Sequence, residues 1–287
     1  TPITEQSSIA GVQMQGDTAV SMGALTSTST LANNSITDGN VIANALDGVL
    51  VTGKGQFSMT TGLITNITST GIELNPANPT QASHGSAILD GVIISAIGEF
   101  GIQTIGGGSA GGGGVSLVNS RISNIGDTTT GIGRGISGLN VGDFGSGASI
   151  LVENSTLSNI GELGIIVNTS NLRVENSQIA STGDFGIESA FASTTLINAS
   201  RITDVTVGVQ AVAGANDDSI SFPGVDVGGV IEDRRNRITI RNNQIRADST
   251  GIILQGAITS TPAVAPAVLA DIDTQSILEG NVRGNLI

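Results

Sequence analysis

The order of apolar and polar positions repeats along the chain. Each copy begins with an apolar residue, has an apolar anchor five positions later, and ends with a glycine followed by isoleucine or valine. The stretch V-E-N-S-T-L-S-N-I-G-E-L-G-I-I-V, from Val152 to Val167, contains all three parts. The anchors are Ile36, Ile64, Ile94, Ile122, Leu157, Ile179, Ile202 and Ile245. The glycine pairs are Gly48-Val49, Gly71-Ile72, Gly101-Ile102, Gly131-Ile132, Gly164-Ile165, Gly186-Ile187, Gly208-Val209 and Gly251-Ile252.

This pattern predicts short strands that stack on copies of themselves. The apolar positions alternate with period two, and no ten-residue stretch has helical periodicity. The anchors lie 22 to 43 residues apart, so loops of different length separate similar units that cannot bury their apolar faces alone. We therefore expect an all-β chain folded as one parallel β-helix over residues 1–287, with about nine or ten coils. Residues 1–30 form an imperfect first coil in this interpretation.

Asparagine and serine recur at one predicted corner of the coil. Asparagine tolerates the left-handed conformation that a sharp bend requires, and stacked asparagine side chains can hydrogen-bond from coil to coil. We interpret this column as a structural device. Its first position holds Asn33, Asn119, Asn154, Asn176, Ala199 and Asn242, and its second holds Ser120, Ser155, Ser177 and Ser200.

Two long insertions interrupt the repeat, at residues 215–236 and 256–273. Each follows a strand that begins with Gly-Val or Gly-Ile, so both should project from one side of the coil stack. Insertions in repeat proteins map to loops on one face, which is often the binding face. We expect these two side loops to carry binding residues.

The repeat resembles the right-handed parallel β-helix of the pectate-lyase-like superfamily, from about Leu31 to Asn285. This superfamily also includes polygalacturonases, phage tailspikes and the passenger domains of bacterial autotransporters and adhesins. The resemblance implies a fold rather than an activity. Among these relatives the chain is most similar to an adhesin or autotransporter passenger, because the motifs of the enzymes are incomplete.

Composition narrows the classes of partner that the chain could bind. The formal net charge is −13 and Lys54 is the only lysine, which argues against nucleic acid, because phosphate binding needs an excess of Lys and Arg. The chain has no cysteine for disulfides and no run of 18 apolar residues that could span a membrane. These features favour an exported or cell-surface bacterial module with a structural or adhesive role. Its expected partners are a glycan, a host surface or another copy of the chain, since β-helix ends expose unpaired strand edges that can assemble into fibres.

An enzyme is the alternative hypothesis. Asp217 and Asp218 resemble the paired-Asp element of polygalacturonases, in which adjacent carboxylates act as general acid and as activator of water. The other motifs of that family are missing: the one His-Gly pair, at His84, lies far upstream, and there is no Arg-Ile-Lys. The chain also has no Trp or Tyr on which a sugar ring could stack. A solvated turn therefore competes with a lyase or glycoside hydrolase site at this pair.

Two charged groups complete the candidates. An acid recurs five positions after the anchor at Glu99, Asp127, Glu162 and Asp184. Stacked in register, these carboxylates would form a column that could share Ca²⁺, but a polar outer turn is the favoured explanation and no Gly-Gly-x-Gly-x-Asp repeat is present. A basic cluster contains Arg234, Arg235 and Arg237, which either pair with nearby acids or contact an acidic glycan or anionic surface.

Overall fold

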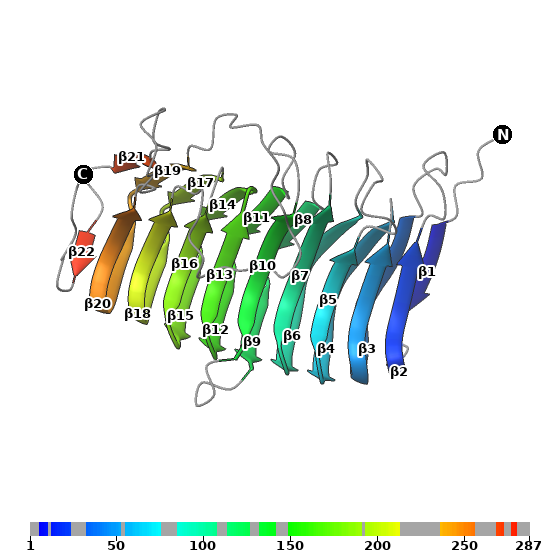
Figure 1. The fold of residues 1–287 in the computed structure, drawn as a ribbon. Helices are drawn as coiled ribbons and strands as arrows, with labels where there is room; N and C mark the ends of the chain where they lie inside the picture. The colour runs from blue at the N-terminus through cyan, green and yellow to red at the C-terminus, as the bar shows by residue number, and fades with distance from the viewer. Residues whose placement is uncertain are drawn as a thin grey trace.

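The computed structural model describes residues 6–10, 13–23, 33–52, 55–75, 85–107, 114–126, 132–141, 149–190, 193–212, 236–255, 268–272 and 277–279. Every helix or strand assigned in these ranges is a β-strand. The strands lie side by side along one long axis, from β1 at one end to β22 at the other (Figure 1). Their pairings are all parallel, as the sequence pattern predicts.

The described strands form nine coils and the beginning of a tenth, which confirms the expected coil number. The first five coils contain β1 (Gln6–Ala10) and β2 (Gln13–Gly23); β3 (Asn33–Thr52); β4 (Gln56–Ile67) and β5 (Thr70–Asn75); β6 (Ser86–Ile97) and β7 (Phe100–Gly107); and β8 (Gly114–Val118), β9 (Arg121–Ile125) and β10 (Arg134–Val141). The others contain β11 (Ser149–Glu153), β12 (Thr156–Ile160) and β13 (Leu163–Asn168); β14 (Asn171–Glu175), β15 (Gln178–Thr182) and β16 (Phe185–Ala190); β17 (Thr194–Asn198) and β18 (Arg201–Val212); β19 (Asn236–Arg241) and β20 (Gln244–Gln255); and β21 (Val268–Ile272) and β22 (Ile277–Glu279).

Each coil presents three faces. Face A contains β8, β11, β14, β17 and β19, face B contains β9, β12 and β15, and face C contains β5, β7, β10, β13 and β16. Longer strands bend around a corner, as β18 does when it pairs with β15 on face B and β16 on face C. We name the corners AB, BC and CA after the faces that they join in chain order.

Stacked aliphatic side chains fill the interior. The predicted anchors from Ile64 to Ile245 pair in register from coil to coil on face B, and each of them is fully buried. The opening apolar residues form a second buried column on face A, in which Val152 pairs with Leu117 and Val174. Because β-branched and aliphatic side chains suit the pleated inner surface of a sheet, these columns specify the fold.

Three predicted alignments are wrong, each where a coil carries extra residues. Ile36 pairs with Met59, so it belongs to face A, and the anchor of that coil is Ile42, which pairs with Ile64. An irregularity between Thr37 and Asn40 lengthens this strand. For the same reason Asn33 lies at the start of the face A segment, where it pairs with Gln56, and not at the corner.

The third misalignment lies in the fifth coil. The sequence G-I-G-R-G-I at residues 131–136 offers two Gly-Ile pairs. Ile136 pairs with Ile102 and Ile165 and is buried, whereas Ile132 is 54% exposed. Gly135-Ile136, and not Gly131-Ile132, is therefore the repeat pair in this coil.

The AB corner is a two-residue turn stabilised by serine. Asn119, Asn154, Asn176, Ala199 and Asn242 occupy its first position with φ between 47° and 54°, as expected for a left-handed bend. The buried serine in the second position makes the contacts between coils.

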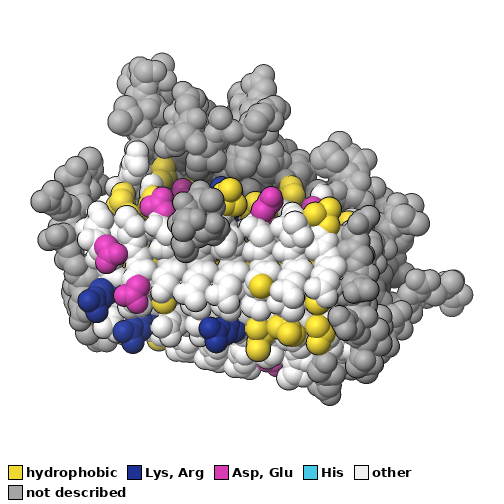
Figure 2. All heavy atoms as spheres, turned by 90° about the horizontal axis from the view of Figure 1, so that it is seen from below, with side chains coloured by type: hydrophobic (Ala, Val, Ile, Leu, Met, Phe, Trp, Pro, Cys, Tyr) yellow, Lys and Arg dark blue, Asp and Glu magenta, His cyan; other side chains and the backbone are white. Residues whose placement is uncertain are grey.

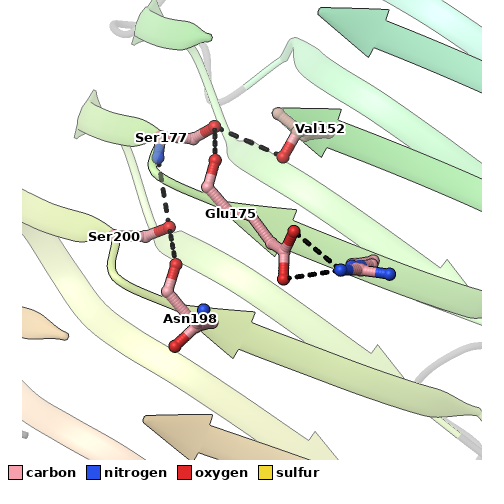
Figure 3. A network of polar contacts seen from close by, with 6 residues as sticks. Val152, Glu175, Ser177, Asn198 and Ser200 are labelled. Atoms are coloured by element: carbon pink, nitrogen blue, oxygen red, sulfur yellow. Dashed lines mark hydrogen bonds and ion pairs between the residues drawn. The ribbon is translucent and has the colours of Figure 1, made fainter. Parts of the chain in front are cut away.

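These serine contacts repeat along the stack (Figure 3). The Ser155 N–H donates to Ser177 Oγ at 3.1 Å, and the Ser177 N–H donates to Ser200 Oγ at 3.2 Å. The Ser177 hydroxyl donates to the carbonyl oxygen of Glu175 at 2.7 Å, and Ser200 makes the equivalent bond to Asn198 at 2.9 Å. We call this series of hydrogen bonds the serine ladder. Serine supplies most of the side-chain contacts between coils at this corner, since few asparagine side chains of the described corner bond to one another.

The two long insertions leave from the CA corner. Val212 ends a face C segment and Asn236 begins a face A strand, so these residues flank the first long insertion at this corner. The second insertion likewise follows Gln255, at the end of the face C part of β20, and precedes β21 on face A. The described residues that flank the two insertions therefore lie at the same corner of the stack.

Candidate functional site

Polar side chains gather at the BC corner, on the outer surface of face C and at the AB corner. At the BC corner the Glu162 N–H donates to the carbonyl oxygen of Gly133, and the Asp184 N–H donates to that of Glu162, both at 2.8 Å. The Arg134 N–H donates to the carbonyl oxygen of Glu99 at 2.8 Å. From one coil to the next, the equivalent position at this corner is therefore occupied by Glu99, Gly133, Glu162 and Asp184.

This order changes the predicted column of four acids. Gly133 occupies the place expected for Asp127, which lies outside the described residues. Glu99 and Glu162 are consequently two coils apart, about 10 Å. Only Glu162 and Asp184 lie on adjacent coils, and among the described residues no group of three or more His, Cys, Asp or Glu could hold a metal ion. Ca²⁺ normally takes six to eight oxygen ligands, more than this pair supplies.

The two adjacent acids differ in their environment. Burial, and secondarily the charge of Glu162, raises the pKa of Asp184 above its ordinary value of 3.8. Glu162 accepts a hydrogen bond at 3.2 Å from Nε of Arg134, whose guanidinium also lies 5.7 Å from the centre of the Phe100 ring. The corner therefore contains one paired and one unfavourably placed carboxylate.

The candidates near the long insertions are mostly outside the described residues. These include Asp217, Asp218, Arg234 and Arg235. Arg237 is exposed on face A, where it pairs in register with Thr194. The structure thus brings one predicted basic residue to the strand that follows the first insertion.

Face C carries polar residues that the sequence reasoning missed. Ser137 is completely buried and Glu188 is 9% exposed, although both occupy outward positions of their strands. The Ser137 hydroxyl and Gln210 Oε1 are buried without a hydrogen-bond partner among the described residues. Beside them Leu163 and Ile166 form a second apolar cluster, separate from the interior. The sequence did contain a signal for polar residues on face C, because Glu188 and Gln210 each follow the Gly-Ile or Gly-Val pair directly.

The AB corner is hollowed between the sixth and ninth coils. A groove of about 410 Å³ runs over this corner, and we call it the corner groove. The buried hydroxyls of Ser155, Ser177 and Ser200 form its floor, while amide side chains and Arg201 form its sides. Figure 2 shows the adjoining face B as a surface of mainly small polar groups, with basic side chains near one long edge.

Comparison with known proteins agrees with this architecture. The chain matches the family model described as "Right handed beta helix region" over residues 47–222. Its fold is similar to a pectate lyase, Pel9A, with a TM-score of 0.52 and 13% identity over 91% of this chain and 69% of that one. It is also similar to an alginate lyase from Paenibacillus sp. str. FPU-7, with a TM-score of 0.51 and 18% identity over 98% of this chain and 92% of that one.

These identities support a common fold and no more. Comparison with curated protein sequences gave no match. The part of the chain that the structure describes contains no helix long and apolar enough to cross a membrane. The stacked parallel coils and the match over more than half of the sequence lead to one conclusion: the chain belongs to the right-handed β-helix family.

Proposed function

We propose that this chain is a structural or adhesive module of an exported or cell-surface protein, which displays loops along one edge for binding or assembly. The observation that carries the proposal is the difference between two corners. The AB corner keeps the same two-residue turn from Asn119-Ser120 to Asn242-Asn243, whereas the CA corner accepts connections of very different length. A rigid stack with variable loops at one edge is the arrangement that repeat proteins use for recognition.

The chemistry of the described residues supports binding over catalysis. They contain no lysine and no histidine, and the whole chain has no tyrosine. Proton abstraction from a sugar by such a surface would have to rely on arginine or a carboxylate. A role in which rows of hydroxyl, amide and guanidinium groups hold a partner needs no such base.

A polysaccharide lyase or glycoside hydrolase is the second candidate. Solved structures of similar fold are named as a pectate lyase and an alginate lyase. Face C, with its recessed Glu188, adjoins the corner from which the insertion bearing Asp217 and Asp218 leaves. On this alternative an acidic polysaccharide would lie on face C, beside the corner from which that insertion leaves.

Replacing the first insertion tests the proposal. Residues 213–235 would be exchanged for a three-residue connection like the one between Ala190 and Thr194. We expect the variant to keep its melting temperature and to elute at lower salt than the parent chain from beads carrying alginate or hyaluronate. An unchanged elution, or a parent chain held by neither kind of bead or by plain ones, would contradict loop-mediated binding.

The same polysaccharides separate the two candidates. A binding module leaves them intact, so neither reducing ends nor unsaturated products should accumulate. Product formation that is abolished by Asp217→Asn with Asp218→Asn, at unchanged melting temperature, would establish the enzyme instead.

A further inference from the structure

The corner groove differs from the rest of its corner at one residue. Four of the five left-handed turns from the fifth to the ninth coil begin with asparagine, the residue that tolerates this conformation best after glycine. The exception is Ala199, with φ of 48°, which lines the groove between Asn176 and Asn242. Alanine is strained there and has no amide, so the column of side chains is interrupted and the groove stays open.

A free cation lies beside this gap. Arg201 lines the groove, is exposed, and has no hydrogen-bond or ion-pair partner among the described residues. No Asp or Glu lines the groove, although the chain has a net charge of −13. Outside the groove, Asp204 lies three positions further along β18, and Glu153 and Glu175 end two of the face A strands, where Glu175 is held by Arg173 at 2.9 Å.

The residues beside Arg201 form a straight row along the coil axis. Parallel pairing places Arg121, Thr156, Gln178, Arg201 and Gln244 at equivalent positions of successive coils. Arg121 is also exposed without a partner among the described residues, and it lies three coils from Arg201, about 14 Å along the row. The row therefore offers hydrogen-bonding groups at every coil and a cation at two separated points.

We propose that the corner groove binds a polysaccharide chain that runs parallel to the coil axis and places an acidic group on Arg201. The amides of Asn176, Gln178, Asn242 and Gln244 can both donate to and accept from sugar hydroxyls, and a guanidinium binds a carboxylate through two parallel N–H groups. An open groove that crosses four coils suits a polymer. The wide spacing of the cations suits a polysaccharide better than a nucleic acid, whose charges are much denser. This site is separate from the CA corner, so it is independent of binding by the loops.

Two substitutions of an alanine by asparagine test the groove without weakening the fold. Ala199→Asn should fill the gap and relieve the strained turn. Ala96→Asn is the matched control, because Ala96 has φ of 55°, stands between Asn66 and Asn124 in a different left-handed column, and is not part of the groove. Both variants should melt at or above the temperature of the parent chain. Arg201→Gln copies the residue found on both neighbouring coils, so it removes the cation alone.

The binding probe is an end-labelled hexasaccharide of galacturonic acid, followed by fluorescence anisotropy, with cellohexaose and a thymidine hexanucleotide as comparison ligands. We expect the acidic hexasaccharide to bind the parent and Ala96→Asn equally, to lose binding to Ala199→Asn, and to bind Arg201→Gln about tenfold more weakly. Failure to bind the parent, unchanged affinity in Ala199→Asn, or equal affinity for the hexanucleotide would overturn the proposal. The variant that lacks residues 213–235 should bind the hexasaccharide like the parent, which distinguishes this site from the loops.

Discussion

The glycine of each repeat pair should be irreplaceable for a steric reason. Seven of these glycines lie under a glycine of the next coil, and a Cβ atom added to any of them would lie 2.4 to 2.7 Å from that carbonyl oxygen. At Gly164 the added atom would lie 2.4 Å from the oxygen of Gly186 and 2.8 Å from Cγ2 of Ile179. Ordinary van der Waals contact begins at 3.4 Å, so Gly164→Ala must push the next coil away by about 1 Å.

The expected cost follows from this overlap. Adding atoms to a well-packed interior typically costs 1–3 kcal/mol, and we expect about 3 kcal/mol at Gly164 because the obstacle is backbone rather than a flexible side chain. A chain of 287 residues has an unfolding entropy of about 0.6 kcal/mol/K near its melting temperature. The melting temperature of Gly164→Ala should therefore fall by about 5 °C.

Gly251 provides a matched control within the same column. It begins the last described repeat pair, and a Cβ atom placed there meets nothing within 4 Å. Its φ is not positive, so alanine should stabilise slightly by restricting the unfolded chain, by about 0.4–1 kcal/mol. Circular dichroism melts of the parent, Gly164→Ala and Gly251→Ala measure the difference. Equal melting temperatures for the two variants would refute the steric explanation of the glycine column.

Three other substitutions probe the interior, the serine ladder and the BC corner. Ile179→Ala, at a fully buried anchor, should cost about 3 kcal/mol and lower the melting temperature by about 5 °C, whereas Ile93→Ala, at a 45% exposed position, should change it by less than about 1 °C; equal losses would contradict the column model. Ser177→Ala leaves the buried N–H of Ser155 without its acceptor and should cost about 1–3 kcal/mol in urea unfolding; an unchanged midpoint would show that the ladder adds no stability. Because the fold raises the pKa of Asp184, the folded state binds its proton more tightly, and stability falls as pH rises from 3.8 through the raised pKa. Asp184→Asn should therefore melt higher than the parent near neutral pH and lose this advantage below pH 3.8, and an advantage that persists at low pH would contradict the assignment.

The fold could be predicted from the sequence because the inward positions must be apolar and must align between coils. The spacing of five residues between Met59 and Ile64, or between Val152 and Leu157, is the same because these coils cross the AB corner with a turn of the same length. Prediction failed where a coil contained extra residues, as at Ile36. Only the pairing of neighbouring coils reveals which of two similar residues faces inward.

The candidate sites were harder to predict because they depend on lateral stacking. Asp127 has the right spacing from its anchor, but extra residues before β10 place Gly133 at the corner instead. Glu188 occupies an outward position of its strand, and the alternation of inward and outward residues does not predict burial at such a position. The sequence places Ala199 in a column of asparagines, and its importance appears only when the neighbouring turns are seen to lie on either side of it.

The serine ladder explains why a single small residue can matter at the AB corner. Each serine accepts from the backbone N–H of the preceding coil and donates to a carbonyl of its own coil, so the turns are held at a constant height and angle. Side chains on either side of the ladder are consequently spaced by the coil repeat, about 4.8 Å, with little freedom to close a gap. Where the repeat omits an amide, as at Ala199, neighbouring side chains cannot move in to replace it. The rigidity that stabilises this corner therefore also preserves an opening, and a linear ligand could use that opening without any change in the fold.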